Sequence, residues 1–156
     1  RSLRYPGIVG WNTDCGGGTT DWSVEMFTEV IHNGEYECFL KEDTRMPLMY
    51  MSDCIRGTVE LIFAPRESLT RCVYNFGGVT FSPKEAANVI HEVYNPKAII
   101  TYRESERQKY ADSWPRSIDD SLARRDWHWN PEFDLKSMAI DILMNLDHSW
   151  KYTEKK

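Results

Sequence analysis

Residues 81–102, FSPKEAANVIHEVYNPKAIITY, contain the clearest local signals in the chain for a helix followed by a strand. Ser82 as N-cap, Pro83 at the first helical position and Glu85 at the third form a capping box with a proline start. The apolar run 98–102 then predicts a strand. A helix that leads directly into a strand is typical of an α/β fold.

The same alternation continues on both sides of this unit. Further strands are expected over apolar segments that end at turn residues: 3–9, with Pro6-Gly7 as a turn signal, 36–40, 46–51 and 72–76. A helix is expected from Thr19 or Thr20 as N-cap to Asn33-Gly34, and its apolar face consists of Trp22, Met26, Phe27, Val30 and Ile31. Further helices are expected from Ser52 as cap to Ala64 and within 118–129. A last helix is expected to start at Asp134, with an inward face of Leu135, Met138, Ala139, Ile142, Leu143 and Leu146. This order predicts an α/β fold without internal repeats.

Composition excludes several classes of protein. A chain of 156 residues with 41% hydrophobic residues can build one globular domain or part of one. Its formal net charge of -5 argues against nucleic-acid binding, which needs a basic face. No apolar run approaches the roughly 20 residues needed to cross a bilayer. The histidines are dispersed and form no metal-ligand spacing, so we expect no metal site.

The start of the chain carries its own expectation. It opens without an initiator methionine, directly into the strand expected at 3–9. A first strand at this position would expose unpaired edges unless another stretch of polypeptide covered it. We therefore expect a chain whose other half lies upstream, or a partner chain that covers residues 3–9.

The stretch CGGGTTDW, residues 15–22, is the first candidate site. It matches neither phosphate-binding glycine motif, because the required lysine and glycine spacing are absent. Backbone amides beside a helix start could still hold an anion such as a carboxylate, with Thr19 and Thr20 adding hydroxyls. The alternative is that the glycines only ease a sharp turn and a threonine caps the helix. Spacing alone favours this second interpretation.

Four other motifs have plainer explanations. ADSWP, residues 111–115, is either a lid over a ligand or a simple turn. Asp119-Asp120 is interpreted as a helix start with surface charge, and His128 between two tryptophans as a packing residue. Tyr152 and Lys156 match the Y-x-x-x-K pair of a general base, but they lie in a polar tail and such a match arises easily by chance.

The segments RSLRYPGI, GGGTTD, MPLMYMSDC, ADSWPRSIDDS and ARRDWHW, taken in this order, resemble a specific family. The chain is similar, from residue 1 to about residue 147, to the carboxyl-terminal half of the metal-free, NAD-dependent L-threonine 3-dehydrogenases. These are extended short-chain dehydrogenases related to nucleotide-sugar epimerases. The resemblance implies the carboxyl-terminal part of a Rossmann-like α/β fold with its small substrate-binding lobe over residues 1–150, followed by a polar tail over 151–156.

The resemblance also implies a reaction, in which the hydroxyl-bearing carbon of L-threonine gives a hydride to NAD and 2-amino-3-ketobutyrate forms. The NAD-binding turn and the catalytic tyrosine and lysine belong to the amino-terminal half of the family, so no catalytic residue is expected in this chain. Substrate binding is carried over to Gly18, Thr19, Thr20, Asp21 and Trp114. The cofactor side is carried over to Tyr5, Pro6 and Gly7, beside the nicotinamide.

Two departures from the family pattern bear on this expectation. Ser52 stands where the family has aspartate, and Lys109-Tyr110 where it usually has small or apolar residues. The first change keeps a good helix cap, and the second puts the geometry of the ligand site in question.

Two functions of different classes therefore remain open. The chain is either the substrate-binding half of an L-threonine 3-dehydrogenase or a catalytically inactive accessory subunit derived from one. A nucleotide-sugar epimerase relative is a weaker third interpretation. The family implies a homodimer and a location in the mitochondrial matrix or the cytoplasm.

Overall fold

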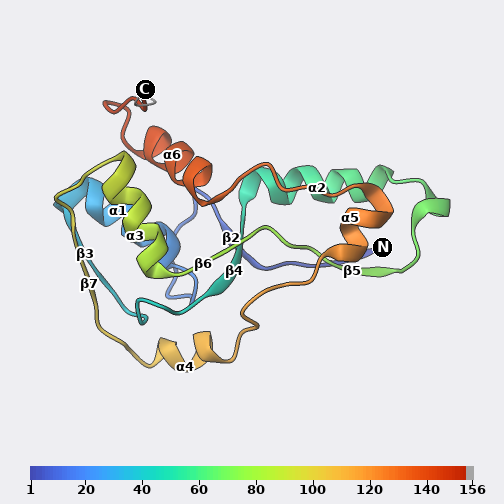
Figure 1. Cartoon of the computed structure of the whole chain (residues 1–156), viewed down its shortest axis with the longest axis horizontal. Helices are drawn as coiled ribbons and strands as arrows, with labels where there is room; N and C mark the ends of the chain where they lie inside the picture. The colour runs from blue at the N-terminus through green and yellow to red at the C-terminus, as the bar shows by residue number, and fades with distance from the viewer. Residues whose placement is uncertain (154–156) are drawn as a thin grey trace.

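The computed structural model describes residues 1–153, and its elements alternate between strand and helix along the chain (Figure 1). The strands are β1 (Ser2–Arg4), β2 (Gly7–Val9), β3 (Glu35–Cys38), β4 (Met46–Tyr50), β5 (Val73–Asn75), β6 (Val79–Phe81) and β7 (Ile99–Tyr102). The helices are α1 (Trp22–Asn33), α2 (Met51–Phe63), α3 (Pro83–Val93), α4 (Arg107–Asp112), α5 (Ser121–Trp127) and α6 (Leu135–Leu146), with a 3-10 turn at Arg66–Ser68. This order confirms the predicted α/β fold.

The strands form small sheets in which parallel pairing dominates. β1 pairs with β5 and β3 pairs with β7, both in parallel. Between them, β4 is the centre of a sheet in which β2 lies parallel and β6 antiparallel. Figure 1 shows α1 and α3 beside β3 and β7 at one end of the molecule, with α6 next to α1 and α3, and α2 and α5 near β5 at the other end.

The central sheet separates two hydrophobic cores. Along β4, Leu48 and Tyr50 belong to the larger core and Met49 belongs to the smaller one. β2 follows the same rule, with Val9 in the larger core and Ile8 packed against the smaller. This division follows from the strand geometry, in which successive side chains point to opposite faces.

Local signals predicted several elements well. The capping box of Ser82 and Glu85 is present at the start of α3. Asp134 starts α6 through a capping box with Ser137, and the inward face of that helix buries Met138, Ala139, Ile142 and Leu143, as expected. Gly34 ends α1 in the left-handed conformation, at φ 74°. Each of these signals lies within a few residues of the helix end that it specifies.

Other boundaries were wrong where tertiary contacts decide them. The break expected in the strand at 3–9 is present, but it falls at Tyr5-Pro6 rather than at Pro6-Gly7, and the two halves pair in different sheets. Ser52 does not cap α2: the helix follows β4 without a loop, begins at Met51 and has Tyr50 at the N-cap. The N-cap of α1 is Asp21 rather than either threonine, and its side chain makes no capping bond to the helix.

The interpretation of His128 was also wrong, and that of Asp120 was right for the helix start, since Asp120 is the N-cap of α5, but wrong for the surface charge. His128 is exposed and ends α5 in the left-handed conformation, at φ 61°, while its neighbours Trp127 and Trp129 are buried. Asp120 is buried rather than a surface charge, and its Oδ1 accepts a hydrogen bond of 2.8 Å from Nε of Arg124. His128 therefore terminates the helix through its backbone conformation, and Asp120 lies in the interior of the protein.

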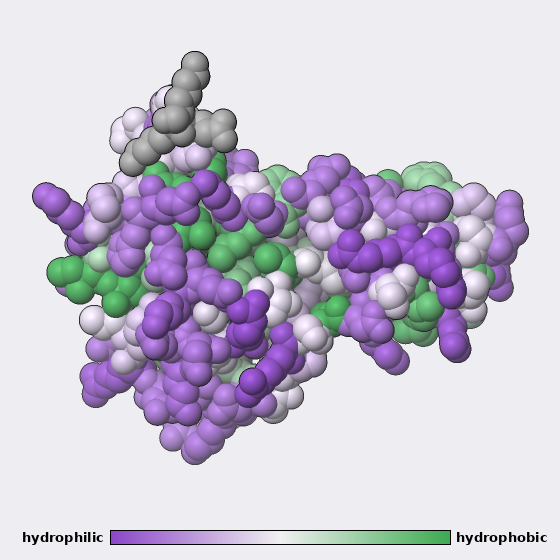
Figure 2. Space-filling view, viewed as in Figure 1, coloured by the Kyte–Doolittle hydropathy of each residue, from purple (hydrophilic) through white to green (hydrophobic). Residues whose placement is uncertain are grey.

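One side of α2 is apolar and uncovered. Ile55, Val59, Ile62 and Phe63 are all exposed, and Phe63 is 81% accessible. Their spacing places them on one helix face. Figure 2 shows hydrophobic surface at the edge of the molecule where α2 lies. Among the described residues, no helix is long and apolar enough to cross a membrane.

Gly57→Ala is expected to lower the free energy of unfolding by about 2 kcal/mol, because a Cβ there overpacks the smaller core. It would lie 2.2 Å from Cζ of Phe76 and 2.5 Å from Cζ3 of Trp129. Alanine favours helix by about 1 kcal/mol over glycine, so the aromatic clash must outweigh that gain. Urea unfolding measures the difference. Ser52→Ala, at an exposed position of the same helix, should change little; equal stability of both variants would contradict the prediction.

A second prediction concerns acid stability. The buried carboxylate of Asp126 accepts hydrogen bonds from Nε of Arg125, from the backbone and hydroxyl of Thr70 and from the Tyr74 hydroxyl. The hydrogen bond from Arg125, and after it those from Thr70 and Tyr74, hold the pKa of Asp126 well below its usual range. Stability from the ionised form is therefore present above the unfolded-state pKa, near about 3.9, and is lost as the pH falls further.

Asp126→Asn is expected to cost about 2–3 kcal/mol at neutral pH. The difference from the unsubstituted protein should shrink as the pH falls from about 5 toward 3. Urea unfolding across this range measures it, with Asp43→Asn at an exposed position as control. A difference that stays constant down to the lowest pH would assign the loss to packing rather than to charge.

Candidate functional site

The carboxylate of Asp21 shapes the glycine loop that precedes α1. Its Oδ2 accepts hydrogen bonds from the backbone nitrogens of Gly17 and Gly18, each at 2.8 Å. Gly17 has φ +91°, which favours glycine, and a Cβ on Gly18 would lie 2.8 Å from Oδ1 of Asp21. The backbone amides of Gly17 and Gly18, which the sequence suggested as donors to a bound anion, therefore already donate to a side chain of the loop itself.

The loop comes into direct contact with the start of β2. A Cβ added to Gly7 would lie 2.7 Å from Cγ2 of Thr20 and equally close to Cδ2 of Leu48. Thr20 is half-buried, and its carbonyl accepts bonds from the backbone and hydroxyl of Ser23. The structure thus brings one residue expected on the cofactor side, Gly7, against one expected on the substrate side, Thr20.

Tyr5 and Pro6 occupy different surroundings from each other. The Tyr5 hydroxyl shares a hydrogen bond of 2.8 Å with Oγ1 of Thr58 on α2, and its ring lies edge-on against Phe76. Pro6 is buried. Tyr5 therefore contacts the α2 side of the molecule, whereas the buried Pro6 leads into the Gly7–Thr20 contact.

The segment around α4 forms the other border of the glycine loop. Trp114 is half-buried against the larger core, and its backbone nitrogen donates to the carbonyl of Ala111. At the start of α4, the guanidinium of Arg107 lies over the ring of Phe39, 4.3 Å from its centroid. Nη2 of Arg107 would be 3.7 Å from a Cβ on Gly17. Sequence reasoning missed Arg107 as a site residue, although Arg107 and Ala111 lie one turn apart on the same face of α4.

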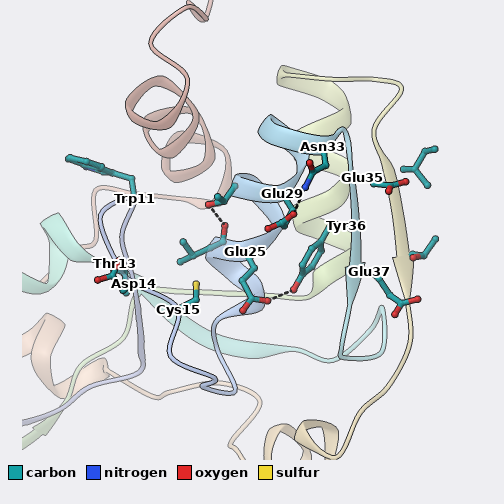
Figure 3. A pocket seen from close by; sticks show the side chains of 14 residues that line it. Trp11, Thr13, Asp14, Cys15, Glu25, Glu29, Asn33, Glu35, Tyr36 and Glu37 are labelled. Atoms are coloured by element: carbon teal, nitrogen blue, oxygen red, sulfur yellow. Dashed lines mark hydrogen bonds between the residues drawn. The ribbon is translucent and has the colours of Figure 1, made fainter.

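A pocket of about 830 Å³ lies beside the loop, on the outer side of α1 (Figure 3). It does not include Gly18, Thr19, Thr20 or Trp114. Its charged lining is acidic: Asp14, Glu25, Glu29, Glu35 and Glu37. In Figure 3, Glu25 accepts a hydrogen bond from the Tyr36 hydroxyl, at 2.9 Å, and Glu29 accepts one from Asn33, at 2.6 Å. Two of these five carboxylates thus accept hydrogen bonds from neutral partners.

One group at the edge of this pocket has metal-ligand chemistry. Ligand atoms of Cys15, Asp21 and Glu25 lie within 4.8 Å of one another. Burial, followed by the charges of Asp21 and Glu25, raises the pKa of the Cys15 thiol to about 11. Asp21 and Glu25 each already accept hydrogen bonds, from the loop amides and from Tyr36. A neutral thiol and two engaged carboxylates are a poor metal site.

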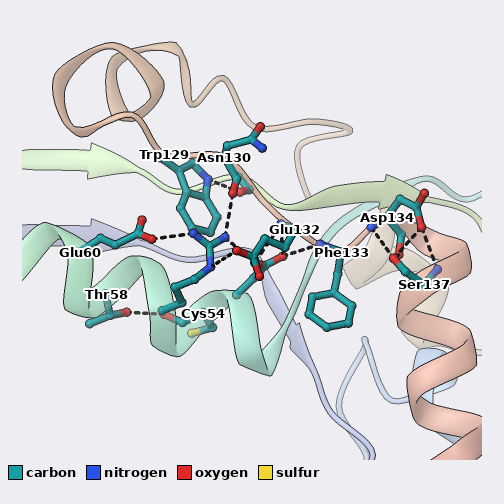
Figure 4. A network of polar contacts seen from close by, with 12 residues as sticks. Cys54, Thr58, Glu60, Trp129, Asn130, Glu132, Phe133, Asp134 and Ser137 are labelled. Atoms are coloured by element: carbon teal, nitrogen blue, oxygen red, sulfur yellow. Dashed lines mark hydrogen bonds and ion pairs between the residues drawn. The ribbon is translucent and has the colours of Figure 1, made fainter.

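A separate polar network joins α2 to the segment that precedes α6 (Figure 4). The carboxylate of Asp53, 1% exposed, accepts bonds from the backbone nitrogens of Glu132 and Phe133 and from Nη2 of Arg56. Arg56 also binds the Asn130 carbonyl and lies over the Trp129 ring. Its groups partner one another and the backbone, so we assign the network to structure rather than chemistry.

The Tyr152–Lys156 pair cannot be placed, since Lys156 lies outside the described residues. At the described end of the chain, the ring of Tyr152 lies 6.1 Å from the ring of Trp150, which in turn contacts Tyr94. The first part of the predicted polar tail therefore stays beside α3.

Comparison with known proteins gives specific neighbours, although no family model matches the chain. A mitochondrial L-threonine 3-dehydrogenase of Bos taurus is 46% identical over 144 residues, which are 92% of this chain and 38% of that protein. The structure of L-threonine dehydrogenase from Phytophthora infestans superimposes with a TM-score of 0.92 at 45% identity and covers 96% of this chain and 48% of that one. A GalE-like L-threonine dehydrogenase from Cupriavidus necator gives 0.89 at 47% identity, covering 94% and 53%. The chain thus spans about half the length of these relatives, or less.

Proposed function

This chain belongs to the epimerase-like L-threonine 3-dehydrogenases and matches their carboxyl-terminal half, and from this we propose that it is the substrate-binding half of an NAD-dependent enzyme of that kind. The reaction would convert L-threonine and NAD to 2-amino-3-ketobutyrate and NADH. The observation that carries the proposal is the contact between Gly7 and Thr20, beside the loop that Asp21 holds.

The residues present fit one side of an NAD site. The sequence contains no G-x-G-x-x-G turn for the pyrophosphate, which the other half of such an enzyme supplies. The buried backbone of Pro6 and Gly7 runs directly beside Thr20, where a nicotinamide and a substrate would have to meet. NAD, when bound, would accept the hydride from the carbinol carbon.

The chain's own residues would bind and orient the amino acid. The hydroxyls of Thr19 and Thr20 would direct polar groups of the substrate, and Asp21 would face its ammonium group while keeping the loop in shape. Trp114 would cover the bound molecule and exclude water. Such contacts raise the rate because they hold the reacting carbon in one orientation. The proton of the hydroxyl group would go to the tyrosine of the other half.

The uncovered apolar face of α2 supports the proposal that further polypeptide packs here. Four exposed apolar side chains on one helix face cost free energy in water. The amino-terminal half of such an enzyme, or an equivalent partner chain over residues 3–9, would bury them. An accessory subunit without activity would need the same cover, so this face supports a partner rather than catalysis. We also propose a homodimer, and a location in the mitochondrial matrix or the cytoplasm.

The test is a hybrid polypeptide in which this chain follows the amino-terminal half of the Cupriavidus necator relative. We expect NADH to form only when both L-threonine and NAD are present. As a matched control, the hybrid should carry a substitution of the relative's own catalytic tyrosine. A folded hybrid that binds NAD yet produces no NADH would contradict the enzymatic proposal and favour the accessory subunit.

A further inference from the structure

Arg107 is a half-buried cation at the border of the glycine loop. Its guanidinium rests on the ring of Phe39, and within residues 1–153 it makes no ion pair with a carboxylate. Other arginines of the chain, such as Arg45 and Arg56, are paired with glutamate or aspartate. Arg107 is thus a positive charge that is held in place without being neutralised by a described carboxylate.

The fold fixes the position of this side chain from both ends. At its base, Arg107 lies one turn before Ala111 on the same face of α4, and Ala111 is buried. At its tip, the guanidinium lies over the ring of Phe39, with Cζ 4.3 Å from the ring centroid, and this cation–π contact supports its position. The position of the charge is therefore set before any ligand arrives.

Gly17 lies between two opposite charges. Its backbone nitrogen donates to Oδ2 of Asp21, and the position where its side chain would begin faces Nη2 of Arg107 at 3.7 Å. Because glycine has no side chain, nothing of Gly17 itself shields the guanidinium. A molecule seated at this loop would meet a fixed negative charge and a fixed positive charge within a few residues.

We propose that Arg107 binds the carboxylate of the amino-acid substrate, while Asp21 faces its ammonium group. The guanidinium presents parallel N–H donors that match a carboxylate, which makes the pair both strong and directional. This inference rests on the proposed function and adds a specificity-determining residue to it. Arg107 selects α-amino acids over amino alcohols that have the same hydroxyl and amine but no carboxylate.

The experiment measures binding of L-threonine and of 1-amino-2-propanol to the hybrid polypeptide in the presence of NADH, by calorimetry. Arg107→Met should weaken L-threonine binding about 10- to 100-fold, the range for a charge-assisted hydrogen bond, and leave the amino alcohol unchanged. Arg107→Lys should lose less, since the charge stays but the paired donors do not. Added guanidinium ion should restore part of the L-threonine binding of Arg107→Met.

Arg103→Met is the matched control. Arg103 is a nearby exposed arginine on the same connection, paired with Glu37 at 3.7 Å, and its removal should leave both ligands unaffected. Phe39→Leu should weaken L-threonine binding less than Arg107→Met, because the cation remains but loses its support.

The outcomes separate the two proposals. Equal weakening of both ligands by Arg107→Met would mean a structural role and overturn the inference, as would unchanged binding of both. L-Threonine binding that depends on Arg107 in a hybrid without dehydrogenase activity would support the inference and overturn only the proposed reaction. Absence of L-threonine binding by the unsubstituted hybrid would overturn both.

Discussion

Asp53→Ala is expected to lower the free energy of unfolding by about 3–4 kcal/mol, the largest effect on stability that we predict. The Asp53 side chain is almost completely buried and receives bonds from two backbone nitrogens and from Arg56. Its removal leaves those nitrogens without an acceptor and the arginine beside an unfilled space. The segment 130–134 would also lose its attachment to α2. Urea unfolding measures the change.

Glu60→Ala provides the control, since Glu60 contacts the same arginine from a more exposed position, at 2.6 Å. Exposed ion pairs contribute about 0–1 kcal/mol, so this variant should remain close to the unsubstituted protein. Asp53→Asn, which keeps one acceptor oxygen, should fall between the two. If Asp53→Ala and Glu60→Ala lost the same amount, the buried amide bonds would not be the source of stability.

Asp21→Ala is expected to reduce the turnover of L-threonine by the hybrid about 100-fold, the largest effect on activity, because a misplaced substrate costs this much. The variant loses the acceptor for the amides of Gly17 and Gly18, so the glycine loop no longer has one shape. It also loses the charge proposed to face the ammonium group. Stability should change by only about 1 kcal/mol, because the loop is exposed. Initial rates of NADH formation and urea unfolding together measure both effects.

Asp14→Ala tests whether any carboxylate in this loop would give the same result. Asp14 is exposed and lies beside Cys15, and its loss should leave turnover unchanged. Asp21→Asn separates the two roles of Asp21, since its amide oxygen can still accept from the loop but carries no charge. A full rate in Asp21→Ala would remove Asp21 from the site, and a full rate in Asp21→Asn would assign it to loop shape alone.

The sequence was sufficient where the cause of a structure is local. The capping boxes of α3 and α6 bring donor and acceptor together within a single turn, and Gly34 ends α1 by its own conformation. The inward faces of α1 and α6 follow from periodicity alone. The family resemblance, carried by segments such as GGGTTD, was confirmed by the relatives.

The sequence was insufficient where distant residues decide. β6 was not predicted, because it has only the residues Val79–Phe81 and exists through its pairing with β4. α4 was not predicted either, since its short sequence is polar apart from Tyr110 and Ala111. In the candidate site, the approach of Gly7 to Thr20 and of Arg107 to Gly17 joins segments far apart in the chain. The hydrogen bonds that Asp21 accepts from the glycine loop are a different case, because their donors are close in sequence. They could not be predicted since an aspartate at this position can cap the following helix or bind the preceding loop equally well.

The chain passes repeatedly from one side of the central sheet to the other: from β1 to β2, from β4 to α2, from β5 to β6 and from α5 to α6. A rotation of one core against the other would have to bend every one of these connections together. The molecule therefore lacks a natural hinge between its ends. Any closing movement over a bound molecule is left to peripheral segments such as 11–18, whose residues are all exposed. Neither end is built from one continuous stretch of the chain, so neither could be cut out as an independently folding domain.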